Sequence, residues 1–169
     1  YANSRNEAKA AKILRKIWPN EYVSVATEIL PEIREFERCS TASLNAYLQP
    51  VVANYLTRLE IKIAAENADS EILIVQSNGG IMSVDTAKSL PVRTALSGPA
   101  AGVVAARQIA KAAGFENVIT GDMGGTSFDV SLVADGQNML TAQASIDFGM
   151  VIRTPMIEIS TIGAGGGSI

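Results

Sequence analysis

Asp122-Met123-Gly124-Gly125-Thr126-Ser127-Phe128-Asp129-Val130 lies between two apolar runs, residues 118–120 and 130–133. This order predicts a strand, a tight glycine turn and a second strand, with an acidic residue on each side of the turn. Two consecutive glycines let the backbone come close to an anion and point N–H groups at it. The following threonine adds a hydroxyl donor, and carboxylates at the rim suit a hydrated Mg²⁺. The stretch therefore favours a nucleotide phosphate loop; an ordinary hairpin with glycines at positive φ is the alternative.

Composition limits the classes of function. The 169 residues suffice for one domain or for one lobe of a larger protein, and 47% of them are hydrophobic. The formal net charge of −3 gives no support for binding to nucleic acid or to a membrane surface. The longest apolar run, residues 100–106, is too short to cross a membrane.

The chain has no histidine and a single cysteine, Cys39. The first absence excludes Ser-His-Asp and Cys-His machinery and histidine-based zinc sites within these residues. Carboxylates, hydroxyls, backbone amides and a metal ion must then carry any chemistry. One cysteine permits no internal disulfide and fits a reducing, cytoplasmic setting. We expect Cys39 to be a small, partly buried hydrophobic residue.

The order of apolar patterns predicts an α/β chain. Helices are expected at residues 3–17, at 40–65 with a kink or break near 47–49 caused by Pro50, around 84–88, and from Ser97 to about residue 113. The apolar stripe of the second helix is expected to pack in a core. Extended segments are expected at residues 22–30, 71–75, 90–93, 139–146 and 151–159.

Glycine-rich segments give two further candidate sites. Asn78, Gly79 and Gly80 follow a predicted buried strand, where α/β sheets place ligands, although a structural turn is the alternative. The small residues of the helix that begins at Ser97 indicate either tight packing or a surface that slides. Residues 163–168 look like a loop leading into a helix N-terminus, or a flexible linker. Because the sequence starts without methionine and stops at this loop, we expect an internal piece of a longer protein.

The order of these pieces resembles the second half of the actin-like ATPase superfamily. Phrases along nearly the whole chain resemble the hydantoinase A/5-oxoprolinase family: PEIRE at residues 31–35 with Glu37-Arg38 and Ser40-Thr41, LNAYL at 44–48, QSNGG at 76–80, LSGPAAG at 96–102, DMGGTSFDV at 122–130 and TIGAGGGSI at 161–169. The resemblance implies a ribonuclease-H-like lobe, with a mixed sheet and flanking helices. Residues 1–66 would connect from the preceding lobe, and residues 67–169 would begin the lobe that carries the phosphate hairpin.

The resemblance also implies an activity, the ATP-dependent opening of a cyclic amide such as a hydantoin or 5-oxoproline through a phosphorylated amide. ATP and Mg²⁺ would be the cofactors. Asp122 and Asp129 would be the catalytic residues, and Asp122 would position the metal, directly or through water, or orient an attacking group. Asp129 would contact the metal or cap the hairpin. The phosphates and the nucleotide would meet Gly124, Gly125, Thr126 and Gly165, Gly166, Gly167, and the substrate or the cleft would lie near Asn78, Gly79, Ser97 and Gly98.

The expected partners are a small cyclic-amide substrate, the missing N- and C-terminal parts of the same polypeptide, and a second, hydantoinase B-like subunit. The isolated fragment, with one of two phosphate hairpins, is expected to be inactive. Two other functions stay open: a ketone carboxylase subunit of the same family, and a non-catalytic actin-like module whose nucleotide controls partner binding. A sugar kinase is disfavoured because the surrounding phrases resemble hydantoinase A.

Overall fold

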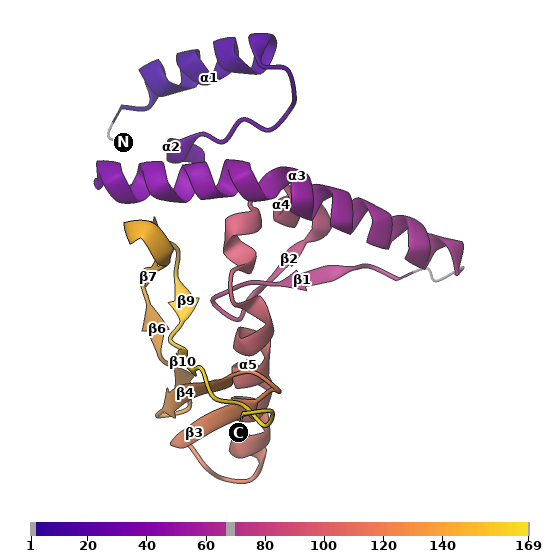
Figure 1. Ribbon diagram of the computed structural model, residues 1–169, viewed down its shortest axis with the longest axis vertical. Coiled ribbons are helices and arrows are strands. Elements are labelled where there is room, and N and C mark those ends of the chain that lie inside the picture. Colours follow the sequence, from indigo (N-terminus) through magenta and orange to yellow (C-terminus); the bar gives the residue numbers. More distant parts are fainter. Residues whose placement is uncertain (1–2, 67–69, 169) are drawn as a thin grey trace. The chain divides into compact units, whose positions relative to one another are not determined.

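The computed structural model describes residues 3–66 and 70–168 (Figure 1). By its internal contacts the chain forms two compact units. Unit 1 comprises Tyr1–Ile74, Met82–Arg93 and Gln143–Thr154, and unit 2 comprises Val75–Ile81, Thr94–Ala142 and Pro155–Ile169. The expected assignment of residues 1–66 and 67–169 to two lobes stays a prediction.

Helices dominate unit 1. They are α1 (Arg5–Ile17), α2 (Ala26–Ile29), α3 (Glu35–Ala65) and α4 (Val84–Ser89). The predicted helices at residues 3–17 and 84–88 are confirmed as α1 and α4. The predicted helix at 40–65 is confirmed as α3, which begins five residues earlier, at Glu35. It runs through Pro50 without a break, and its course bends along its length (Figure 1).

The apolar stripe of α3 is only partly buried. Leu56 is 3% exposed and packs with Met82, Val84 and Ala87, while Val52 and Leu59 border the cluster. Val51 and Tyr55 belong to the apolar stripe that was predicted to pack in a core, yet they are 67% and 64% exposed. The prediction was wrong for these two residues because the elements of unit 1 cover only the face that Val52, Leu56 and Leu59 share.

Three predictions are wrong: the extended segments at residues 22–30 and 90–93, and the partial burial of Cys39. Residues 22–30 contain the helical turn α2, which buries Ile29 instead of pairing with a strand. The segment 90–93 enters a 3₁₀ helix, η1 (Pro91–Thr94), whose turn is closed by a hydrogen bond from the Arg93 N–H to the Leu90 carbonyl, 3.1 Å. The fixed φ of proline suits such a turn as well as a strand. Cys39 is exposed.

Unit 2 combines one long helix with an antiparallel sheet. The helix is α5 (Ser97–Ala112), as predicted, and the strands are β3 (Val118–Met123), β4 (Phe128–Ala134), β5 (Gln137–Asn138) and β10 (Ser160–Ile162). They are ordered β10-β4-β3, with β5 paired to β4. Ala100 and Val103 of α5 pack against Val133 of β4 and Ile157. This packing holds the helix beside the sheet (Figure 1).

The remaining strands are short. The predicted strand at 71–75 is β1 (Leu73–Val75), which forms a two-stranded sheet with β2 (Ile81–Ser83). The predicted strands at 139–146 and 151–159 occur in pieces: β6 (Leu140–Thr141) pairs with β9 (Met156–Ile157), and β7 (Ala144–Ser145) pairs with β8 (Val151–Ile152), which follows the 3₁₀ turn η2 (Asp147–Gly149). The α/β prediction is confirmed. The mixed sheet is not found, since every pair with a defined register in the described residues is antiparallel.

Candidate functional site

The predicted glycine hairpin is confirmed as β3, residues 124–127 and β4. The two strands pair antiparallel from Val118 opposite Val133 to Met123 opposite Phe128. A hydrogen bond of 2.9 Å from the Gly124 N–H to the Ser127 carbonyl closes the turn. The glycine hairpin therefore brings its two predicted carboxylates, 122 and 129, opposite each other.

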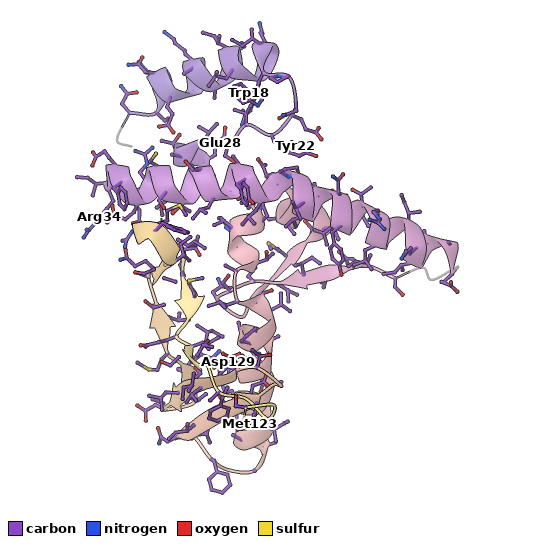
Figure 2. The ribbon with its side chains drawn as sticks, in the orientation of Figure 1. Trp18, Tyr22, Glu28, Arg34, Met123 and Asp129 are labelled. Atoms are coloured by element: carbon purple, nitrogen blue, oxygen red, sulfur yellow. The ribbon has the colours of Figure 1, made fainter. Side chains whose placement is uncertain are left out.

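A row of polar side chains crosses the sheet near this turn. Asp122 on β3 lies opposite Asp129 on β4, which in turn lies opposite Thr161 on β10. Directly paired residues project from the same face of a sheet. The Thr161 hydroxyl donates to Asp129 Oδ1 over 2.6 Å. Figure 2 labels Asp129 on β4 and Met123 at the end of β3. Thr161 was not predicted, because the register of β10 against β4 leaves no mark in the sequence.

Small residues let other groups approach the carboxylates. A Cβ at Gly102 of α5 would lie 3.8 Å from Asp122 Oδ2, so the helix backbone passes close to this carboxylate. A Cβ at Gly121 would lie 2.8 Å from the ring of Phe128. Gly121 therefore lets the aromatic ring lie across the hairpin. The sequence indicated close approach for the small residues of α5, Gly102 among them, but not the carboxylate as its neighbour. Sequence reasoning missed Gly121.

The turn also offers unused hydrogen-bond donors. Gly124, Gly125 and Thr126 are exposed. Within the described part of the chain, the backbone N–H groups of Gly125 and Thr126 have no acceptor. The Gly124 N–H, which was also predicted to hold a phosphate, is used in closing the turn. Two adjacent free donors beside two carboxylates suit an anion that arrives with a cation.

Residues 163–168, which we call the glycine loop, lie against the side of the turn where the carbonyls of Gly124 and Gly125 point. The N–H groups of Gly166 and Gly167 donate to the carbonyls of Gly124 and Gly125 over 2.9 and 2.8 Å. A Cβ at Gly165 would lie 2.6 Å from the Gly124 carbonyl oxygen. The glycine loop thus contacts the glycine hairpin, and the N–H groups of Gly165, Gly166 and Gly167 all have partners within the protein.

A cavity of about 610 Å³ lies between α5 and the hairpin strands. Asp122 and Asp129 belong to its lining, and most of the other lining residues are apolar or small: Pro99, Gly102, Val103, Ala106, Ile109, Ala110, Ala113, Phe115, Val118, Ile119, Gly121, Val130 and Ile159. The small residues of α5 therefore leave open space beside the two carboxylates.

The four predicted substrate residues do not line this cavity. Asn78 accepts a hydrogen bond of 2.8 Å from the Gly80 N–H, which makes a local turn. Gly79 has φ +81° and packs so close to Val104 that a Cβ would lie 2.6 Å from that side chain. Ser97 is the first residue of α5, and Gly98, next to it, faces open space. The positive φ of Gly79 and its close contact with Val104 explain structurally why this position has no side chain.

The described residues show neither of two other kinds of site. The described residues contain no group of three or more acidic, cysteine or histidine side chains that could hold a metal ion. Nor does any helix in the described part of the chain combine the length and apolar character needed to cross a membrane. The glycine hairpin is the strongest candidate site because its free N–H groups adjoin two paired carboxylates.

Comparisons with known proteins agree on one family. Residues 38–169 match the family model for hydantoinase/oxoprolinase. The chain is 37% identical to the alpha subunit of caprolactamase from Pseudomonas jessenii, over 99% of this chain and 24% of that subunit. It is 34% identical to the gamma subunit of acetophenone carboxylase from Aromatoleum aromaticum, over 100% of this chain and 24% of that subunit.

A solved structure agrees with the sequence comparison. The crystal structure of ATP-dependent caprolactamase from Pseudomonas jessenii matches 99% of this chain and 24% of its own chain, with a TM-score of 0.84 and 38% identity. The chain thus spans about a quarter of the length of these relatives. From its sequence and its fold, the chain belongs to the hydantoinase/oxoprolinase family.

Proposed function

We propose that this chain is part of an ATP-dependent enzyme that opens a cyclic amide, and that the glycine hairpin holds the phosphates of ATP. One observation carries the proposal: the free N–H groups of Gly125 and Thr126 lie at the turn between two paired carboxylates, Asp122 and Asp129. The family relationship supports it, since the matched caprolactamase structure is described as ATP-dependent.

The donor set fits a magnesium nucleotide. Mg²⁺ in phosphate sites takes one or two protein carboxylates together with phosphate oxygens and water. Asp122 is exposed and would hold the ion, while Asp129 is half-buried and held by Thr161. The amides of Gly125 and Thr126, with the Thr126 hydroxyl, would hold phosphate oxygens. When bound, ATP supplies the phosphoryl group that makes a resonance-stabilised amide carbonyl reactive.

We propose a ribonuclease-H-like lobe of an actin-like ATPase as the wider fold, and α5 beside the antiparallel hairpin supports this proposal. Phosphoryl transfer depends mainly on positioning and on neutralising charge. The described residues supply one set of phosphate donors, and the complete polypeptide would supply the second hairpin. A hydantoinase B-like subunit and a cytoplasmic location stay predictions.

A ketone carboxylase subunit is the second candidate. The observation in its favour is the 34% identity to the acetophenone carboxylase gamma subunit, which extends over the whole chain. The same hairpin would serve both reactions, because both require a nucleotide phosphate to be held. The two functions therefore have to be distinguished by the substrate that the enzyme turns over.

The test uses the complete polypeptide, together with its second subunit if it purifies with one. ADP release with MgATP is measured alone, with hydantoin, 5-oxoproline or a lactam, and with a ketone plus bicarbonate. We expect ring-dependent turnover in the wild type and its loss in Asp122→Asn. Asp135→Asn, a matched change at the exposed turn after β4, should leave turnover unchanged.

Turnover with ketone and bicarbonate alone would move the protein to the carboxylase branch. MgATP binding without turnover on any substrate would contradict both enzymatic functions and favour a nucleotide-controlled binding module. Full activity of Asp122→Asn would remove the glycine hairpin from the reaction.

A further inference from the structure

The glycine loop binds one side of the hairpin turn at two consecutive peptide groups. The Gly166 N–H donates to the Gly124 carbonyl over 2.9 Å, and the Gly167 N–H donates to the Gly125 carbonyl over 2.8 Å. Adjacent carbonyls of an extended strand point in opposite directions. In this turn, by contrast, both carbonyls face the glycine loop, which holds the two peptide groups in the same orientation.

That orientation determines where the free donors of the turn point. In a planar trans peptide group, the carbonyl oxygen and the N–H of the next residue lie on opposite sides. Among residues 3–66 and 70–168 no peptide bond is cis. Because the carbonyls of Gly124 and Gly125 face the glycine loop, the N–H groups of Gly125 and Thr126 point away from it. Successive N–H groups on one side form a backbone site for an anion.

The fit between the loop and the turn leaves no room for a side chain at two positions. A Cβ at Gly165 would lie 2.6 Å from the Gly124 oxygen and 2.7 Å from the Thr126 nitrogen, and a Cβ at Gly167 would lie 2.8 Å from the Gly125 oxygen. Both glycines have φ values outside the left-handed region, so their backbone conformation is open to alanine. The absence of side chains therefore serves the contact with the hairpin.

Ser168 gives the glycine loop a defined shape. Its hydroxyl accepts a hydrogen bond of 3.0 Å from the Gly165 N–H, and its own N–H donates to the Gly165 carbonyl over 3.0 Å. The turn that results presents the N–H groups of Gly166 and Gly167 to the hairpin. Gly163, at the other end of the loop, has nothing near the position of a Cβ.

We propose that Gly165, Gly166 and Gly167 are positioning residues that act on the nucleotide through the hairpin. They hold the peptide groups of the turn so that the Gly125 and Thr126 N–H groups face the phosphates. This inference rests on the proposed function and deepens it. It assigns the glycine loop to the back of the phosphate site, where its amides bind protein carbonyls and not the ligand.

The experiment compares Gly165→Ala with Gly163→Ala in the complete polypeptide. Binding of MgATP and of adenosine, which has no phosphate, is measured by calorimetry. We expect Gly165→Ala to weaken MgATP binding about tenfold or more, because donors to a charged phosphate would be misdirected, and to leave adenosine binding unchanged. Gly163→Ala should bind both ligands as the wild type does.

The other outcomes separate the two proposals. Wild-type MgATP affinity in Gly165→Ala would overturn the positioning role and leave the proposed function standing. Equal weakening of MgATP and adenosine, with a lowered Tm, would also overturn it, since that pattern reports a general structural role. If the wild type itself fails to bind MgATP, the proposed function fails first.

Discussion

The two units place their polar groups in opposite settings. In unit 1, Asn45 is 1% exposed, and its amide donates to Ser24 Oγ over 2.9 Å and to the Ser89 carbonyl over 3.0 Å. Its Oδ1 accepts from the Val92 N–H over 3.2 Å. In unit 2, the turn of the glycine hairpin is exposed and keeps the N–H groups of Gly125 and Thr126 free of partners in the described residues.

The difference separates structural from ligand-binding motifs. A buried polar group whose hydrogen bonds are all made stabilises one arrangement of the chain, and breaking it leaves partners unsatisfied. Exposed donors that adjoin carboxylates gain their partners only when a ligand arrives. The phrase at residues 44–48 and the phrase at 122–130 both carried the family resemblance, yet only the second has the properties of a binding site.

The largest expected effect is on catalysis and comes from unit 2. Asp122→Asn keeps the shape of the side chain and removes its charge, so we expect turnover to fall about 100-fold or more. Hydrogen exchange of β3 and β4 should stay as in the wild type, because Asp122 is exposed. The two measurements are made on one preparation. A loss of protection across the hairpin would show that Asp122 acts on the fold, and the contrast between the units would fail.

The matched change in unit 1 should act on stability. Asn45→Leu leaves the Val92 N–H without its acceptor and removes the donors to Ser24 and Ser89, at a cost of about 2–4 kcal/mol. Hydrogen exchange measured in peptides that cover residues 89–93 should report this loss. Asn54→Leu, at an exposed position of the same helix, is the control and should cost little. Unchanged protection in Asn45→Leu would mean that the buried network is dispensable.

The same substitution, threonine to valine, can be made once in each unit to compare them. In unit 1, Thr41 is 0% exposed; its hydroxyl donates to the Glu37 carbonyl over 2.7 Å and accepts from the Arg153 N–H over 3.0 Å. Thr41→Val should cost about 1–3 kcal/mol, because the Arg153 N–H loses its acceptor. In unit 2, Thr161 is exposed and holds Asp129.

Thr161→Val should therefore cost stability only within about 0.5 kcal/mol and should lower kcat several-fold through Asp129. Thermal unfolding and steady-state kinetics of both variants give the comparison. If Thr41→Val lowered kcat without changing Tm, while Thr161→Val did the reverse, the assignment of roles would be inverted.

Much of the fold and the core of the site could be predicted from local sequence. Helical periodicity located α1 and α3, the proline near its start located α5, and the glycine pair located the hairpin turn. The predictions of secondary structure were wrong where tertiary contacts overrode the local preference of the residues for a strand. Residues 22–30 are rich in β-formers but meet no partner strand, so they close a helical turn that buries Ile29.

Long-range contacts account for what the sequence could not predict. Thr161 holds Asp129, and the glycine loop binds Gly124 and Gly125, across separations in the chain that no local pattern encodes. The sequence identified Gly165, Gly166 and Gly167 as candidates for a nucleotide site. The structure shows which of their N–H groups already have partners, and that information depends on the tertiary fold.

The smallest expected effect is a pH dependence confined to unit 1. Partial burial raises the pKa of Glu7, but the hydrogen bond from the Thr27 N–H and the hydrogen bond and charge of Arg38 together hold it below its ordinary value of 4.5. Glu7 Oε2 lies 2.9 Å from Arg38 Nη2. A carboxyl whose pKa is lower in the folded state stabilises the fold above its unfolded pKa.

That contribution should be fully present above about pH 4.5 and should decline as the pH falls through the lower, folded pKa. Glu7→Gln removes the titrating group, so the difference in stability between wild type and variant should shrink on acidification. Glu21→Gln, at an exposed position of unit 1, serves as the control and should show no such convergence. Hydrogen exchange of α1 and α2 between pH 3 and 6 gives the measurement after correction for intrinsic rates. A difference that grows toward low pH would mean that Glu7 is protonated in the folded state, and that its bond to Arg38 does not stabilise unit 1.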